Sequence, residues 1–191
     1  MLDTPRSTPS ARGCPRPAPA RRGASVVRVS PSRPLRLLMD ARYTRTDFHD
    51  GISRYGASLI EAVARRAAAP GPAGADVEVA MLISDERQLA LLPDGVPWHL
   101  VSGPTSPREP FVARQVARLR PDVVFSPMQT MGSWGRDYAL ILTLHDLIYY
   151  EHRTPPRNLS EPIRWLWRAY HLTKIPQRLL LDRADAVATV S

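Results

Sequence analysis

Short apolar runs alternate along the chain with longer segments whose apolar residues recur every three or four positions. The runs are typical of strands buried on both faces, and the longer period is typical of helices that pack one side on a sheet. The predicted strands are 35–40, 76–83, 98–101, 122–126, 139–144 and 186–190, and the predicted helices are 51–67, 108–120 and 161–182, the last with a bend at Pro176. This alternation predicts an α/β fold with a Rossmann-like, doubly wound parallel sheet.

The first 34 residues do not follow this pattern. They contain seven arginines, seven prolines and one acid, which gives them a net charge of +6 out of +8 for the whole chain. Such a segment buries too little apolar surface to offset its ordering entropy. We therefore expect residues 1–34 to be a disordered tail and residues 35–191 to form the domain. A transit peptide and an over-extended gene start are alternative interpretations of the tail.

The charge balance also limits the partners. Because the folded part carries only about +2, it offers little of the basic face that nucleic-acid binding requires, and we expect no specific nucleic-acid partner. The single cysteine, Cys14, lies in the tail, where it cannot form an intramolecular disulfide. No apolar run is long enough for a membrane-spanning helix, and the N-terminus has no signal-peptide core. These features predict a cytoplasmic protein.

One predicted helix has a composition that could bind a membrane surface. Segment 161–176 combines Trp165, Trp167 and Tyr170 with basic residues, a composition found in helices that lie on membrane surfaces. A helix that packs its aromatic side on the sheet would have the same composition, and we favour this second interpretation. Peripheral binding to the inner face of the membrane stays open as the alternative.

In open parallel sheets, ligands bind beyond the carboxyl ends of the strands. After the first predicted strand, Gly51 begins a helix, so free backbone N–H groups and the positive end of the helix dipole could hold a phosphate. The alternative is an ordinary helix start with Asp50 as the N-cap.

After the fifth predicted strand, His145 and Asp146 leave the sheet together. An imidazole there could bind a sugar hydroxyl or titrate near neutral pH. The alternative is that Asp146 caps a turn and His145 binds backbone. His145 and His152, with Asp146, could also suggest zinc. One pair of residues without a third ligand in a defined position is weak support for a zinc site, and we expect no metal. The loop after the fourth strand, with Gln129 and Trp134, could shape an acceptor pocket or simply connect two strands.

Several segments, in this order, resemble the N-terminal, acceptor-side half of family 4 retaining glycosyltransferases, which have the GT-B fold. The matching segments are Met39–Arg42, Gly51–Tyr55, Pro121–Ser126, Leu144–Leu147 and Arg183–Ser191. The resemblance covers the chain from about residue 35 to its end. It implies transfer of a mannosyl- or glucosyl-type sugar from a nucleotide-sugar donor to a glycan or lipid-linked acceptor, with no metal or other cofactor.

The resemblance also implies roles for individual residues. His145 would be the catalytic residue that contacts the transferred sugar, while Gly51 and Asp146 would contact the donor. The acceptor would be bound by four residues from the same loops, namely Arg54, Tyr55, Gln129 and Trp134.

Enzymes of this family have a second domain that carries the basic phosphate-binding residues and a paired-glutamate donor motif. Residues 35–191 account for one domain only, and the chain stops directly after a predicted strand. We therefore expect half of an enzyme, either truncated or completed by a separate chain, and we expect the chain alone to be inactive. The alternative, from a different functional class, is a non-catalytic Rossmann-like binding or scaffold domain.

Overall fold

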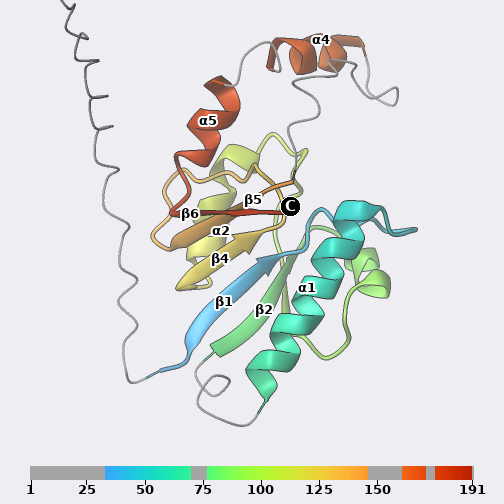
Figure 1. Ribbon diagram of the computed structural model, residues 1–191, viewed down its shortest axis with the longest axis vertical. Coiled ribbons are helices and arrows are strands. Elements are labelled where there is room, and N and C mark those ends of the chain that lie inside the picture. The colour runs from blue at the N-terminus through green and yellow to red at the C-terminus, as the bar shows by residue number, and fades with distance from the viewer. Residues whose placement is uncertain (1–32, 70–76, 146–160, 171–174, 191) are drawn as a thin grey trace, which may run out of the picture.

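The computed structural model describes residues 33–69, 77–145, 161–170 and 175–190 (Figure 1). Its centre is a six-stranded sheet in the order β3-β2-β1-β4-β5-β6, and every neighbouring pair is parallel. The strands are β1 (Leu35–Asp40), β2 (Val77–Ile83), β3 (Trp98–Leu100), β4 (Val123–Ser126), β5 (Ala139–Leu144) and β6 (Ala186–Thr189). The predicted Rossmann-like parallel α/β fold is confirmed.

The strand order places a topological switch between β1 and β4. The chain builds β1, β2 and β3 outward in one direction, and then returns to add β4, β5 and β6 on the other side of β1. Loops that leave the carboxyl ends of β1 and β4 therefore diverge, which opens the position where sheets of this kind bind ligands.

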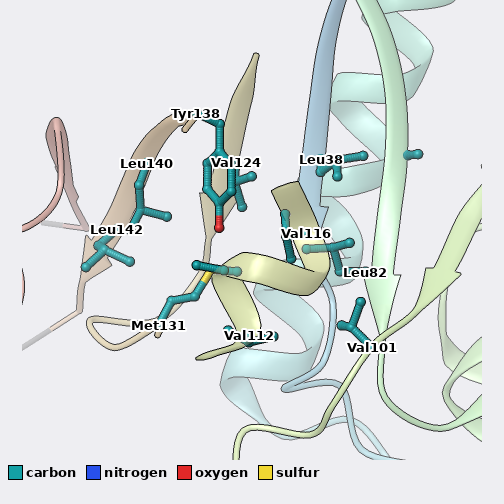
Figure 2. Packing of buried hydrophobic residues seen from close by; sticks show 12 residues of the cluster. Leu38, Leu82, Val101, Val112, Val116, Val124, Met131, Tyr138, Leu140 and Leu142 are labelled. Atoms are coloured by element: carbon teal, nitrogen blue, oxygen red, sulfur yellow. The ribbon is translucent and has the colours of Figure 1, made fainter. Parts of the chain in front are cut away.

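Two helices cover opposite faces of the sheet (Figures 1 and 2). They are α1 (Gly51–Ala68) and α2 (Val112–Ala117). Successive residues of β1 point to opposite faces, so Met39 packs in the cluster under α1 while Leu38 packs in the cluster under α2. This is why β1 is apolar at consecutive positions rather than at alternate ones.

The ends of α1 follow from its sequence. The Asp50 carboxylate accepts a hydrogen bond from the backbone N–H of Ser53 at 2.8 Å, which makes it the N-cap. The helix ends before Ala69, whose backbone is extended as expected for a residue that precedes proline. Ile60 is fully buried in the middle of the helix and fixes its apolar side on the sheet.

The remaining helical segments differ from the expectations. The predicted helix 108–120 is a 3-10 turn, η2 (Glu109–Phe111), followed by the short α2. Beyond α2, Arg120 has a φ of 52°, a left-handed conformation that cannot continue a helix. Another 3-10 turn, η1 (Glu86–Leu91), was not predicted, although Asp85 and Gln88 form a capping box there.

The third predicted helix divides into α4 (Glu161–Tyr170) and α5 (Ile175–Leu181). Pro176 lies in the first turn of α5, where proline is tolerated, rather than at a bend within a continuous helix. The expectation that the aromatic side of α4 packs on the sheet is wrong for Trp165, whose surface is 67% exposed. None of the helices in the described ranges is both long and apolar enough to cross a membrane.

The boundary of the predicted tail has one observable contact. Most of the tail, including Cys14, lies outside the described residues, but Arg33 is described. Its guanidinium forms an ion pair with Asp122 at 2.6 Å, next to the start of β4. Arg33, which the sequence assigned to the tail, therefore contacts the domain.

Candidate functional site

The carboxyl ends of β1, β4 and β5 lie side by side in the sheet, and a buried ionic network joins β1 and β4. The Asp40 carboxylate, at the end of β1, accepts hydrogen bonds from Arg42 Nε at 2.8 Å and Arg42 Nη2 at 3.0 Å. At the end of β4, the Ser126 hydroxyl donates to Asp40 Oδ2 at 3.0 Å. The network therefore lies across the topological switch.

A second acid completes the network. Arg42 Nη1 contacts Glu109 Oε2 at 2.6 Å, and both the Arg42 and Asp40 side chains are fully buried. Burial alone would lower the pKa of Arg42, but the charges and hydrogen bonds of Asp40 and Glu109 outweigh it and raise that pKa. Arg42 is therefore a permanent cation between two carboxylates.

The network also fixes the loops around it. Glu109 Oε1 accepts the backbone N–H of Gly132 at 3.1 Å, and a Cβ at Gly132 would lie 1.8 Å from the Glu109 carbonyl oxygen. Gln88 donates to the carbonyl oxygens of Arg42 and Thr44 at 3.0 and 2.5 Å. The loop after β1 is consequently held in place before any ligand binds.

His145, the predicted catalytic residue, directly follows β5 and is partly buried. Its Nε2 lies 2.5 Å from the carbonyl oxygen of Pro127, in the loop after β4. A carbonyl can only accept a hydrogen bond, so Nε2 carries the proton and donates. In the neutral ring, Nδ1 is then left as an acceptor for another group.

Tyr55 of α1 sets the orientation of this imidazole. The two rings meet edge to face, with centroids 5.2 Å apart and planes at 85°. The structure therefore brings together two of the predicted site residues, Tyr55 and His145, which are 90 positions apart in the sequence. The helix that contains Tyr55 also begins with Gly51, the predicted phosphate contact.

Gly51 is exposed, and a Cβ built on it would meet no atom within 4 Å. It does not have a positive φ, so neither its backbone conformation nor its packing requires glycine. The neighbouring Ser53 is buried, and its hydroxyl lies 2.9 Å from His49 Nδ1. Arg54 is exposed on the first turn of the helix.

The other predicted site residues have different surroundings. The side-chain Oε1 of Gln129 accepts a hydrogen bond at 2.7 Å from Nε2 of Gln177, a buried residue of α5. Trp134 stacks on Phe111, at the start of α2. Asp146 and His152 lie outside the described residues. Within the described ranges, no three His, Cys, Asp or Glu side chains gather closely enough to hold a metal.

The sequence reasoning missed the role of Arg42 and Glu109. One signal was present: Met39-Asp-Ala-Arg places an acid and a base two positions apart at the end of a buried strand. A buried acid in such a place needs a cationic partner. The third member, Glu109, is 67 residues away and carries no local signal.

No family model matches the chain, and no significant match was found among curated proteins or among solved structures.

Proposed function

We propose that the chain is the acceptor-side half of a retaining glycosyltransferase with the GT-B fold. The observation that carries this proposal is the contact between Tyr55 and His145 at the carboxyl edge of the sheet. It brings one residue from each of two segments that resemble family 4 enzymes, Gly51–Tyr55 and Leu144–Leu147, into contact at the edge where ligands of such sheets bind.

The available atoms at this edge suit a sugar. With Nε2 bound to Pro127, the neutral His145 ring offers Nδ1 to accept a hydrogen bond from a hydroxyl of the transferred sugar. Gly51 leaves open space at the start of α1, where the Asp50 carboxylate already accepts the Ser53 N–H, so a diphosphate would bind to the other backbone N–H groups of the first turn. The exposed guanidinium of Arg54 would serve the acceptor.

Catalysis in this proposal depends on position and charge. The acceptor oxygen bonds to the anomeric carbon, the bond from that carbon to the diphosphate breaks, and the hydroxyl proton passes to the leaving diphosphate. This transfer requires the acceptor hydroxyl to be aligned with the anomeric carbon and the leaving diphosphate to be neutralised. The ionic network of Arg42 fixes the loop after β1 and so contributes to alignment. Neutralisation would come from a second domain of the kind that family 4 enzymes have.

One observation favours a second candidate, a non-catalytic binding or scaffold domain. The hydrogen bond from His145 to the Pro127 carbonyl and the Tyr55 ring contact are also the surroundings of a structural histidine. The coding DNA downstream separates the two candidates. A neighbouring frame that encodes a domain with Glu-x₇-Glu supports the enzyme, whereas its absence there and elsewhere in the genome favours the scaffold.

Substitution of Gly51 tests the phosphate contact. We expect Gly51→Ala to change the free energy of unfolding by no more than about 0.5 kcal/mol, because the added methyl meets no atom within 4 Å. Once a donor domain is supplied, the same methyl should obstruct the diphosphate and raise the KM for the nucleotide sugar. Urea unfolding and steady-state kinetics measure the two effects. An unchanged KM would assign Gly51 to the helix start alone.

A further inference from the structure

A pocket lies beside the loops that lead into β5 and β6. It has a volume of about 410 Å³ and is lined by Ser133, Trp134, Gly135, Arg136 and Arg183. Arg136 and Arg183 come shortly before β5 and β6, so they belong to the amino edge of the sheet. Trp134 stacks on Phe111, which directly precedes α2, so the pocket extends from this edge toward the start of that helix.

The indole of Trp134 is held as a fixed, exposed surface. It is 61% exposed, and it stacks on Phe111 with ring centroids 5.4 Å apart and planes at 21°. Arg114 in turn covers Phe111, with its guanidinium carbon 5.4 Å from the ring centroid. Gly135 permits the turn with a φ of 79°, and a Cβ there would come within 3.2 Å of Arg114 Nε. A large aromatic surface in one orientation loses little entropy on binding.

The two lining arginines have different roles. Arg136 donates to the Tyr138 carbonyl and to the Asp185 carboxylate at 2.5 Å each, and to the Arg183 carbonyl at 2.8 Å. Burial alone would raise the pKa of Asp185, but its hydrogen bonds from Arg136 and from the Leu140 N–H lower it. Arg136 therefore fastens the loop to the sheet. Arg183 is exposed, and its guanidinium has no partner among the described residues.

We propose that this pocket binds a nucleotide, with the base stacked on Trp134 and the phosphate bound by Arg183. A planar base gains by stacking while its polar edges stay in water. A sugar ring has hydroxyl groups on its whole perimeter, and each needs a hydrogen-bonding partner. Beyond Ser133 and Arg183, the pocket has few polar groups that are free to bind them. The exposed guanidinium favours a phosphate, which arginine binds through two N–H groups. This site includes neither Tyr55 nor His145, whose contact carries the glycosyltransferase proposal.

The test is a calorimetric titration of the full chain with AMP, UMP, glucose 6-phosphate and inorganic phosphate. We expect the two nucleotides to bind at least tenfold more tightly than the other two probes. Trp134→Ala should weaken nucleotide binding by about five- to 150-fold, the fold-change that corresponds to the stacking energy of one base. Arg183→Gln should weaken it and reduce its dependence on salt. Trp165→Ala removes an equally exposed tryptophan from α4 and should change nothing.

Three results would overturn the proposal. One is nucleotide binding that Trp134→Ala leaves unchanged, which would place the base elsewhere. Another is that glucose 6-phosphate or inorganic phosphate binds as tightly as the nucleotides, because the base would then contribute nothing to the affinity. The third is no nucleotide binding at millimolar concentration. Trp134→Phe keeps an aromatic ring on Phe111 and should retain most of the affinity. Circular dichroism of Trp134→Ala shows whether a loss of binding in that variant comes from misfolding.

Discussion

Replacement of Arg42 with methionine should lower the free energy of unfolding by about 3–5 kcal/mol. The side chain is fully buried between Asp40 and Glu109, so its removal leaves Asp40 buried with only the Ser126 hydroxyl and a backbone N–H as partners. Methionine keeps much of the apolar stem, which confines the effect to the lost charge and its hydrogen bonds. Urea unfolding monitored by circular dichroism measures the change.

Two further variants make this result interpretable. Arg65→Met removes a cation from an exposed pair with Glu61 on α1, and should cost no more than about 0.5 kcal/mol. Arg42→Lys keeps the charge but loses the bidentate contact with Asp40. Its loss in free energy of unfolding should lie between those of the two methionine variants. If Arg42→Met proved no more destabilising than Arg65→Met, the buried network would not be what holds the loop after β1.

Replacement of His145 with alanine should lower turnover by about tenfold to a thousandfold when a donor domain is present, the range for one or more lost transition-state hydrogen bonds. It should also cost about 1 kcal/mol of stability, because the Pro127 carbonyl loses its donor. Turnover per folded molecule, measured beside thermal unfolding, separates the two effects.

His145→Gln separates the effect on stability from the effect on turnover. A glutamine amide can take the place of Nε2 and donate to the Pro127 carbonyl, but it offers nothing in the place of Nδ1. We expect His145→Gln to recover the stability lost in the alanine variant while turnover stays low. His99→Ala, at β3 on the far side of the sheet, is the control and should leave turnover unchanged. Normal turnover with lowered stability in His145→Ala would make His145 a structural residue.

The sequence contained enough information for the strands and for α1. Each strand is a compact apolar run between polar or proline-containing segments, and α1 has both its cap, Asp50, and its apolar stripe within one segment. The capping box of Asp85 and Gln88 was equally local and could have predicted η1. Local chemistry therefore determines where these elements begin and end.

The contacts between loops could not be predicted in the same way. Arg42 and Glu109 meet because η2 turns back over the loop after β1, and no local pattern encodes that meeting. Between β4 and β5 the chain crosses from the carboxyl edge to the amino edge of the sheet. Along this crossing Gln129 contacts Gln177 of α5, whereas Trp134 stacks on Phe111 at the start of α2, and no local pattern predicts either contact.

The central claim, that this domain forms half of a sugar-transferring cleft, is tested most directly by product formation. The chain is combined with its donor domain, by co-expression or fusion, and supplied with nucleotide sugar and a panel of glycan and lipid-linked acceptors. We predict a glycosylated product that keeps the anomeric configuration of the donor, abolished when either half is omitted. A folded assembly that binds the nucleotide sugar, yet forms no product with any acceptor, would contradict the claim and leave a binding or scaffold domain.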